Sequence, residues 1–344
     1  MLAARWHGTR DVRLEDVAEP EAAPGEALVE VACAAVCGSD VAEYRDGPHV
    51  IPVERPHPLT GRMAPVALGH EYSGRVVALG PDVTRVAVGD RVCGDSCLRC
   101  SVCRWCLRGE YNICRLGGSV GLHADGAFAR YLKVPDYTLV KLPASITDRE
   151  GALVEPLAVG LHAVKQGRVE AGDVVVVVGA GMIGIAAILM ARRLGAAEVF
   201  VAEPRMERAE VALSLGATGI LPPDLASASR PVRADVVIEC SGRPEVVAGA
   251  LELVRRGGRL VLAGIGHGPA ALEVSRVVYF EREIMGTLGY RFDLERVVAL
   301  MAAGQLEVTR LLSEPIALAD IVAEGFERVL NDPSAPPRVF VAAA

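Results

Sequence analysis

The sequence feature that most constrains the fold is a run of five valines that leads directly into a glycine-rich turn. The run Val174–Val178 is continuous, apolar and β-branched, as expected for a strand buried on both faces of a parallel sheet. Residues 179–184 follow the pattern Gly-x-Gly-x-x-Gly, and a helix is expected from there to Leu194. In this context the glycines let backbone N–H groups approach a pyrophosphate at the N-terminus of the helix. The sequence therefore predicts a doubly wound parallel sheet that binds a dinucleotide.

The next strand is expected at 199–202, and the acidic residue that follows it bears on whether the cofactor is NAD or NADP. Glu203 lies where a carboxylate binds the ribose hydroxyls of NAD, and the alternative is a solvated carboxylate at a strand end. Arg205 and Arg208 follow closely, and an arginine there can accommodate the 2′-phosphate of NADP. We expect NAD, because Glu203 would repel that phosphate. The cofactor contacts predicted from these segments are Gly179, Gly181, Met182, Ile183, Gly184, Glu203 and Arg208.

The alternation of strands and helices continues after this motif. Further strands are expected at 234–240, 259–264 and 283–288, and helices at 244–254 and 293–304. About six strands in all would complete a doubly wound sheet. A last strand is expected at 338–341, in a tail that rejoins the N-terminal part of the chain.

The N-terminal part of the chain has a different pattern. Short β-rich segments at 27–32, 72–80 and 88–92 alternate with glycine turns, which is typical of a small, partly closed β domain. A chain of 344 residues is too long for one ordinary core. The sequence therefore predicts an α/β protein of two domains.

Two motifs in the β-rich part contain the ligand types that Zn²⁺ prefers. Cys37-Gly38-Ser39-Asp40 and Gly69-His70-Glu71 supply a thiolate, an imidazole and carboxylates, and the residues between them are expected to form a long loop. A site with few protein ligands keeps an open position, as a catalytic zinc requires. Glu155 is a candidate further ligand. The alternative is a first-turn carboxylate favoured by the helix dipole, with Pro156 at the first helical position.

A run of cysteines predicts a second metal site. Cys97, Cys100, Cys103 and Cys106 lie three residues apart, and Cys114 follows. Closely spaced cysteines suit a closed tetrahedral Cys₄ zinc site better than disulfides in a chain without an export signal. Five cysteines compete for four places. Their spacing leaves open whether Cys97 or Cys114 is free.

Composition excludes several classes of partner. The net charge is −7 and no long basic run occurs, which argues against nucleic acid or an anionic membrane as partner. No apolar run approaches transmembrane length, and the first residues lack the apolar core of a secretory signal. We therefore expect a cytoplasmic protein that acts on a small molecule.

Taken together, these motifs make the sequence similar to the zinc-dependent medium-chain alcohol dehydrogenases over essentially its whole length. The matching segments are Cys37-Gly38-Ser39-Asp40, Gly69-His70-Glu71, the cysteine run, Glu155-Pro156-Leu157 and residues 179–184. The resemblance implies a GroES-like catalytic domain over 1–157 with a structural zinc lobe. It further implies a Rossmann NAD-binding domain over 158–292 and a return of 293–344 to the catalytic domain. It also implies a homodimer or homotetramer.

The resemblance assigns roles to single residues. It implies one structural zinc on Cys100, Cys103, Cys106 and Cys114. It implies one catalytic zinc on Cys37 and His70, with Glu71 and Glu155 as further carboxylates. Ser39 would accept the alcohol proton, and Asp40 would bond the far nitrogen of His70.

Within the family, the loop His57-Pro58-Leu59-Thr60-Gly61 resembles the 2,3-butanediol dehydrogenase branch, with sorbitol and threonine dehydrogenases as near relatives. This branch implies a small vicinal diol or hydroxyketone as substrate. The alternatives are a polyol, a threonine-type substrate or a non-catalytic relative of the fold. One position departs from the family: Ala42 stands where relatives usually place a proton-relay histidine. Either Glu43, His49 or a water chain replaces it, or the substrate differs from that of the family's named members.

Overall fold

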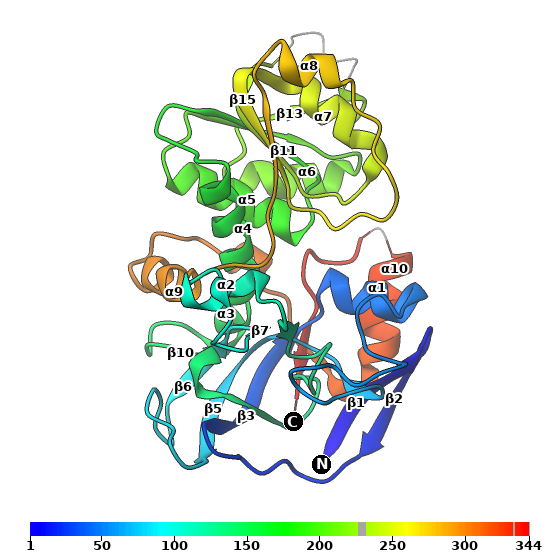
Figure 1. The fold of residues 1–344 in the computed structure, drawn as a ribbon, viewed down its shortest axis with the longest axis vertical. Helices are drawn as coiled ribbons and strands as arrows, with labels where there is room; N and C mark the ends of the chain where they lie inside the picture. The colour runs from blue at the N-terminus through cyan, green and yellow to red at the C-terminus, as the bar shows by residue number, and fades with distance from the viewer. Residues whose placement is uncertain (226–231, 333, 344) are drawn as a thin grey trace. The chain divides into compact units, whose positions relative to one another are not determined.

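The computed structural model describes residues 1–225, 232–332 and 334–343 and divides into two compact units (Figure 1). The first unit comprises Met1–Glu155 and Val308–Ala344, and the second comprises Pro156–Glu307. The chain leaves the first unit inside helix α4 (Val154–Gln166), close to the expected boundary. It returns at Val308, later than the expected residue 293. The reason is local: Asp293 precedes helix α9 (Leu294–Ala302) and is bound by His162 and Lys165 of α4.

The first unit is built around strand β3 (Glu26–Ala35), which explains its partly closed β fold. Its main sheet has the strand order β10-β6-β5-β3-β18-β17, and β9 also pairs with β3. A smaller sheet has the order β2-β1-β4. The other strands are β1 (Leu2–Gly8), β2 (Asp11–Asp16), β4 (Val66–Ala67), β5 (Glu71–Leu79), β6 (Arg91–Gly94), β9 (Tyr131–Pro135), β10 (Leu139–Lys141), β17 (Ile316–Ala317) and β18 (Phe340–Ala342).

The helices of the first unit are short. They are α1 (Gly38–Asp46), α2 (Arg104–Leu107), η1 (Tyr111–Ile113), η2 (Asp136–Thr138), α3 (Asp148–Ala152), η5 (Thr309–Leu311), η6 (Leu318–Asp320), the π-helical η7 (Ile321–Glu327) and α10 (Arg328–Asn331). Trp6, Phe128 and Phe326 are fully buried in the core of this unit. The C-terminal strand β18 pairs antiparallel with β3, so the tail rejoins the N-terminal strands as expected (Figure 1). That strand begins at Phe340, two residues later than predicted.

The expectation of a loop between Asp40 and Gly69 was wrong for residues 41–46, because they belong to α1, which begins at Gly38. The backbone N–H of Cys37 donates to Asp40 Oδ2 at 2.9 Å, which is half of a capping box. Cysteine is an unusual N-cap residue and glycine a poor helix former, so propensity conceals this helix start. The loop that was predicted begins only after α1.

The second unit contains the predicted parallel sheet. Its six strands have the order β13-β12-β11-β14-β15-β16 and all neighbouring pairs are parallel. The strands are β11 (Val174–Val178), β12 (Glu198–Ala202), β13 (Gly219–Leu221), β14 (Ala234–Glu239), β15 (Val254–Leu262) and β16 (Glu283–Gly286). The helices are α5 (Met182–Arg193), α6 (Met206–Ser214), η4 (Pro244–Val246), α7 (Val247–Leu253), α8 (Val274–Val278) and α9. Sequence analysis had named no segment for β13.

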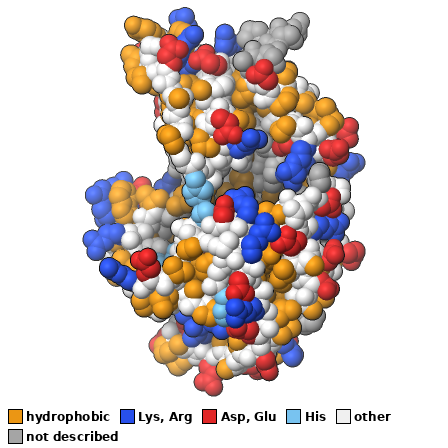
Figure 2. All heavy atoms as spheres, turned by 90° about the vertical axis from the view of Figure 1, so that its right-hand side faces the viewer, with side chains coloured by type: hydrophobic (Ala, Val, Ile, Leu, Met, Phe, Trp, Pro, Cys, Tyr) orange, Lys and Arg blue, Asp and Glu red, His pale blue; other side chains and the backbone are white. Residues whose placement is uncertain are grey.

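The face of the protein drawn in Figure 2 carries side chains of both charges, as expected for a chain with a net charge of −7. Basic and acidic side chains are interspersed with hydrophobic ones on the face drawn in Figure 2. Within the described residues, no helix combines the length and the hydropathy needed to cross a bilayer.

Candidate active site

Strand pairing brings the two zinc-type motifs together. Ala35, the last residue of β3, pairs with Glu71, the first residue of β5. Cys37 therefore follows one strand where His70 precedes its neighbour. One ligand atom from each of Cys37, His70 and Glu71 lies within 4.8 Å of the others, and these three form one of the two metal-type groups among the described residues. His70 and Glu71 are buried, and Cys37 is partly exposed.

The side chains on α1 orient His70. Asp40 is fully buried with Oδ1 3.4 Å from His70 Nδ1, and Ser39 Oγ lies 3.3 Å from His70 Nε2. A carboxylate at Nδ1 favours a proton on that nitrogen and leaves the Nε2 lone pair for a metal. Burial opposes a charge on His70, but Asp40 and Cys37 outweigh it and raise the pKa of the imidazole well above its usual value. Metal binding would release that proton.

Arg338 is a member of this site that sequence analysis missed. Its guanidinium lies 2.8 Å from Glu71 Oε1 and donates to the carbonyl of Val36 at 2.8 Å, with 5% of the residue exposed. The pairing of β18 with β3 on the side opposite β5 places Arg338 there. Burial raises the pKa of Glu71 well above its usual value, although Arg338 lowers it. The only available signal was an arginine before an apolar strand, which does not identify an active-site residue.

The thiol of Cys37 is prepared for metal binding. Burial opposes its ionisation, but the nearby His70 and Arg338 outweigh burial and lower the pKa of Cys37 to about 6. The second oxygen of Glu71, Oε2, is buried and has no hydrogen-bond partner within the described part of the chain. A partly ionised thiol, an oriented imidazole and an unsatisfied carboxylate oxygen fit a zinc ion. The residues present are therefore compatible with the metal that the sequence predicts.

Glu155 lies outside the group of Cys37, His70 and Glu71. It is the second residue of α4 and 7% exposed, and it accepts a hydrogen bond from Ser96 Oγ at 3.4 Å. Its charge acts on Arg338 and raises that residue's pKa together with the charges of Glu71 and Cys37. Glu155 therefore borders the site through Arg338, and it is also the first-turn carboxylate of a helix. Its position therefore fits both interpretations from the sequence, a carboxylate near the metal site and a carboxylate in the first turn of a helix.

The cysteine run forms the second metal-type group, and it consists of Cys100, Cys103, Cys106 and Cys114. Their sulfur atoms are separated by 3.5 to 4.0 Å in the four pairs Cys103–Cys106, Cys114–Cys100, Cys103–Cys114 and Cys100–Cys106. A tetrahedral zinc with bonds of about 2.3 Å requires sulfur atoms about 3.8 Å apart. The geometry therefore fits a closed Cys₄ site.

The Cys₄ lobe, residues 99–117, is closed at its base by strands β7 (Cys97–Leu98) and β8 (Gly118–Ser119), which pair antiparallel. Cys97 lies in this base, where its backbone N–H donates to Asp95 Oδ1 at 2.8 Å. Burial raises the pKa of the Cys97 thiol well above its usual value. Hydrogen bonds from backbone N–H groups lower the pKa of Cys103 to about 6. The spacing of the cysteines left open whether Cys97 or Cys114 is free. The four sulfur atoms that lie together in the structure include that of Cys114 and leave Cys97 outside the group.

The candidates for a proton relay near Ala42 have other contacts. Glu43 is buried, and its carboxylate accepts hydrogen bonds from the backbone N–H groups of His49, Val50 and Ile51 at 2.9, 2.7 and 3.3 Å. Glu43 thus anchors the loop after α1. His49 Nε2 lies 2.8 Å from Asp46 Oδ1 at the end of the same helix.

In the second unit, the glycine turn has the expected backbone requirements. Gly179 has φ +92°, and a Cβ on Gly184 would lie 1.9 Å from the carbonyl oxygen of Gly179. Gly181 precedes the first residue of α5, Met182, which is buried, while Ile183 is partly exposed. The turn therefore packs against the first turn of α5 at a distance that only glycine permits.

Glu203 is not the solvated carboxylate that the alternative assumed. It is 8% exposed, and its two oxygens accept hydrogen bonds from the backbone N–H groups of Ala180 at 2.8 Å and Arg205 at 3.0 Å. Arg208 is partly exposed, and burial lowers its pKa, as does the like charge of Arg205. Glu203 therefore links the glycine turn to the end of β12, beside both arginines.

A second buried carboxylate of this unit escaped sequence analysis. Glu239, at the end of β14, accepts hydrogen bonds from the backbone N–H of Ser241 at 2.6 Å, from Gly242 at 3.1 Å and from the Ser241 hydroxyl. A Cβ on Gly179 would lie 3.1 Å from the backbone nitrogen of Ser241. Glu239 thus fixes the loop that packs on the glycine turn.

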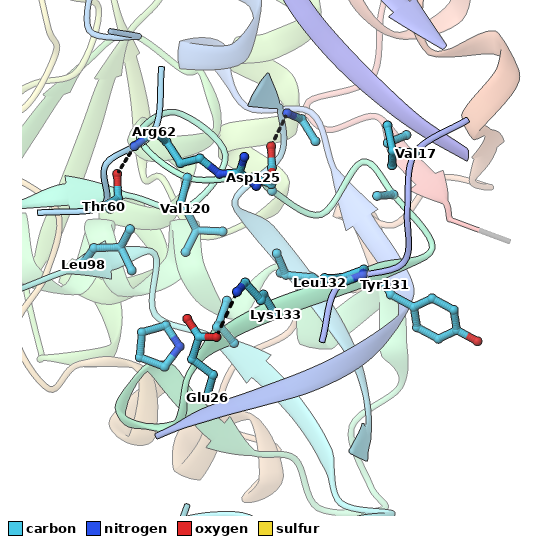
Figure 3. A pocket seen from close by; sticks show the side chains of 18 of the residues that line it. Val17, Glu26, Thr60, Arg62, Leu98, Val120, Asp125, Tyr131, Leu132 and Lys133 are labelled. Atoms are coloured by element: carbon cyan, nitrogen blue, oxygen red, sulfur yellow. Dashed lines mark hydrogen bonds and ion pairs between the residues drawn. The ribbon is translucent and has the colours of Figure 1, made fainter. Parts of the chain in front are cut away.

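A cavity of about 730 Å³ lies in the first unit, and no member of either metal-type group lines it (Figure 3). Leu98, Val120 and Leu132 line it, and Lys133 and Glu26 form an ion pair of 3.2 Å at its wall. Its lining contains none of Cys37, His70 and Glu71. We therefore do not assign the alcohol to this cavity.

Comparison with known proteins gives matches over the whole chain. Residues 23–144 match the alcohol dehydrogenase GroES-like domain, and residues 183–303 match the zinc-binding dehydrogenase domain. The chain is 36% identical to (R,R)-butanediol dehydrogenase of Bacillus subtilis (strain 168), covering 97% of both chains. It is 30% identical to sorbitol dehydrogenase of the same organism, covering 96% of this chain and 94% of that one.

Solved structures agree with these matches. The crystal structure of 2R,3R-butanediol dehydrogenase from Bacillus subtilis superposes with a TM-score of 0.92 at 35% identity, covering 99% of both chains. A zinc-binding dehydrogenase from Sinorhizobium meliloti 1021, solved with NADP bound, superposes with a TM-score of 0.88 at 30% identity. It covers 99% of this chain and 98% of that one.

Proposed function

This chain belongs to the zinc-dependent alcohol dehydrogenase family, whose members are oxidoreductases acting on CH–OH donors, and we propose that it transfers a hydride between NAD and a small vicinal diol or its hydroxyketone. The observation that carries the proposal is the convergence of Cys37, His70 and Glu71 in one group with the Ser39 hydroxyl beside His70 Nε2. A non-catalytic relative of the fold would have no reason to keep both this group and the glycine turn.

In the proposed reaction, Cys37 and His70 would hold the catalytic zinc, and Glu71 and Glu155 would supply the further carboxylates. A zinc ion bound there supplies a Lewis acid that lowers the pKa of a bound alcohol toward neutrality. Ser39 would accept the alcohol proton while it passes its own hydroxyl proton to solvent, and the 3.3 Å separation of its Oγ from His70 Nε2 supports this role. Asp40 keeps the imidazole in the tautomer that leaves Nε2 free.

A vicinal diol suits a site of this composition. One hydroxyl of the diol would give its proton to Ser39, and the other would meet a polar group of the site. Sites that bind a second hydroxyl reject analogues that lack it, because their own buried polar groups are then left unpaired. The likeness to butanediol dehydrogenases supports the same class. Polyols and threonine remain the competing substrates.

The substrate proposal is tested by the rate of NAD⁺ reduction under saturating cofactor. We expect a higher kcat/KM for 2,3-butanediol than for 2-butanol, sorbitol or threonine. A clear preference for the monohydric alcohol, the polyol or the amino acid would contradict the diol proposal. The assignment to zinc alcohol dehydrogenases would stand in each of those cases.

NAD is the proposed cofactor because the carboxylate of Glu203 is held at the end of β12, where a 2′-phosphate would meet a negative charge. Arg205 and Arg208 work in the opposite direction, and a structural relative was solved with NADP. We expect kcat/KM to be higher with NAD⁺, and we expect E203A to narrow the difference. Equal or better use of NADP⁺ by the unaltered enzyme would refute this preference.

Two zinc ions per chain are proposed, since the two ligand groups share no residue. Metal analysis of protein purified without chelator should give close to two zinc ions per chain. A value of one or none in active protein would contradict the assignment. Light scattering would distinguish the proposed homodimer from the homotetramer.

A further inference from the structure

The base of the Cys₄ lobe contains an arginine that contacts two tyrosine rings. The guanidinium carbon of Arg99 lies 4.1 Å from the ring centre of Tyr111 and 4.3 Å from that of Tyr137. Tyr111 belongs to η1 inside the lobe, whereas Tyr137 belongs to η2, between strands β9 and β10 of the main sheet. The planar guanidinium of Arg99 therefore contacts one ring inside the lobe and one ring next to the main sheet, a pair of cation–π contacts that the compact ammonium of a lysine does not reproduce.

Arg99 also makes polar contacts with Asp95 and with the hydroxyl of Tyr137. Its guanidinium is 3.8 Å from Asp95 Oδ2, and its backbone N–H donates to the Tyr137 hydroxyl at 3.2 Å. Asp95 also accepts hydrogen bonds from the Tyr111 side chain and from the backbone N–H of Cys97. We call Asp95, Arg99, Tyr111 and Tyr137 the Arg99 clamp. It encloses the short segment that joins β6 to the Cys₄ lobe.

That segment also contacts the candidate catalytic site. Ser96, the residue after Asp95, donates to Glu155 at 3.4 Å and is 6% exposed. Glu155 acts on Arg338, which pairs with Glu71. The segment between β6 and Cys100 therefore contains Asp95 and Arg99 of the clamp together with Ser96, which contacts Glu155.

Structural stability alone does not explain the clamp. The Arg99 side chain is 14% exposed, and its Nη1 has no hydrogen-bond partner among the residues described. Burying a charge with incomplete hydrogen bonding costs free energy, and apolar residues often stabilise such positions better. What the guanidinium adds is a fixed orientation relative to two rings and one carboxylate.

We propose that Arg99 is a positioning residue that holds the Asp95–Cys97 segment in place so that Ser96 orients Glu155 at the catalytic zinc site. The inference rests on the proposed function for its kinetic consequence. The contacts that join the Arg99 clamp to the two metal sites, Arg99 with Tyr111 in the Cys₄ lobe and Ser96 with Glu155, do not depend on which reaction the enzyme catalyses.

The test compares R99K, which keeps the charge but loses the planar group that contacts both tyrosine rings, with R104K. Arg104 is a matched control, because it is an exposed arginine on the same lobe whose guanidinium carbon lies 4.4 Å from the centre of one ring, that of the partly exposed Trp105. A chromogenic chelator reads the release of both zinc ions without any substrate. We expect R99K to release zinc from both sites about tenfold faster, which corresponds to the loss of cation–π contacts of ordinary strength. R104K should stay within twofold of the unaltered protein.

Steady-state kinetics distinguish a positioning role of Arg99 from a purely structural one, because a purely structural role would not change kcat selectively. R99K should lower kcat about tenfold and leave the KM for NAD⁺ unchanged, because the glycine turn belongs to the other unit. The kinetic effect of R99K should shrink at least about threefold in an S96A background, since both changes act on Glu155. Equal effects in both backgrounds, or zinc release and kcat equal to those of R104K, would overturn the proposal.

Tyr137 gives an independent pair of variants if R99K does not fold. Y137F keeps the ring and loses only the hydroxyl contacts with the Arg99 backbone, so it should release zinc more slowly than Y137L, which should behave as predicted for R99K. Identical zinc release from the two Tyr137 variants would overturn the proposal. If the enzyme oxidises no alcohol at all, the proposed function fails, and zinc release from both sites still tests the clamp.

Discussion

Replacing Arg338 by methionine should be among the most destabilising single changes at the candidate site. The side chain is 5% exposed and Glu71 is fully buried, with 2.8 Å between the guanidinium and Glu71 Oε1. Removing one partner of a buried ion pair costs about 3–5 kcal/mol, because the other charge stays buried without compensation. The carbonyl of Val36 also loses its donor, and an unsatisfied buried group costs about 1–3 kcal/mol. Since the two losses overlap, we expect a decrease of about 4 kcal/mol in the free energy of unfolding.

The assay is urea unfolding of R338M, E71Q and the double variant, with zinc content measured for each. Metal content is required because loss of zinc would otherwise be mistaken for loss of the ion pair. The double variant should recover a large part of the R338M effect, since it no longer buries an unpaired carboxylate. R328M is the control: Arg328 pairs with Glu324 and Asp332 while 39% exposed, so its loss should cost less than about 1 kcal/mol.

Two outcomes would refute this reasoning. R338M could unfold with a free energy within about 1 kcal/mol of the unaltered protein, as expected for an exposed pair. Alternatively, the double variant could be less stable than R338M by the full effect of E71Q, which would mean that the two residues do not interact. Either result would show that the buried pair does not hold the C-terminal segment against the metal-type group.

Three further predictions follow from other parts of the structure. Cys103→Ser should remove one zinc per chain and lower unfolding stability more than it changes chemistry, because a closed Cys₄ site contributes folding energy; metal analysis with urea unfolding checks this, and two retained zinc ions would contradict it. Burial, with a smaller effect of His57, lowers the pKa of His123 from 6.5 to about 4, so the unfolded chain binds the extra proton first and stability should fall as the pH drops from 6.5 toward 4. His123→Asn should flatten that part of the stability profile, and an unchanged slope would exclude His123 as its source. Ser39→Ala should lower kcat about 10²-fold or more with a smaller change in KM, and an unchanged kcat would exclude Ser39 as the proton acceptor.

Local sequence determined the elements whose residues depend only on their immediate neighbours. The valine run forms a strand in the middle of a parallel sheet, and the glycines after it form the turn before α5. These follow from the sequence because the strand pattern and the steric limits on Gly179 and Gly184 act within a few residues. The cysteine run likewise brings its sulfur atoms together within one short lobe.

Helix ends and short strands were less accessible. The start of α1 depends on the contact between Asp40 and the backbone of Cys37, a residue type that rarely caps helices. Strand β13 has three residues and no distinctive pattern. Propensity is too weak to identify either element, because one tertiary or capping contact exceeds the preference of so few residues.

The composition of the candidate site was decided by long-range pairing. The sequence contains Cys37, His70 and Glu71 as motifs, but it is the pairing of β3 with β5 that brings them within 4.8 Å. Arg338 comes from the far end of the chain, and it reaches Glu71 because β18 pairs with the opposite edge of β3. The Arg99 clamp joins Tyr111 and Tyr137 in the same way. Residue type and spacing thus determine which chemistry this protein has available, whereas strand pairing decides which buried charges meet, because such contacts join residues that local sequence does not connect.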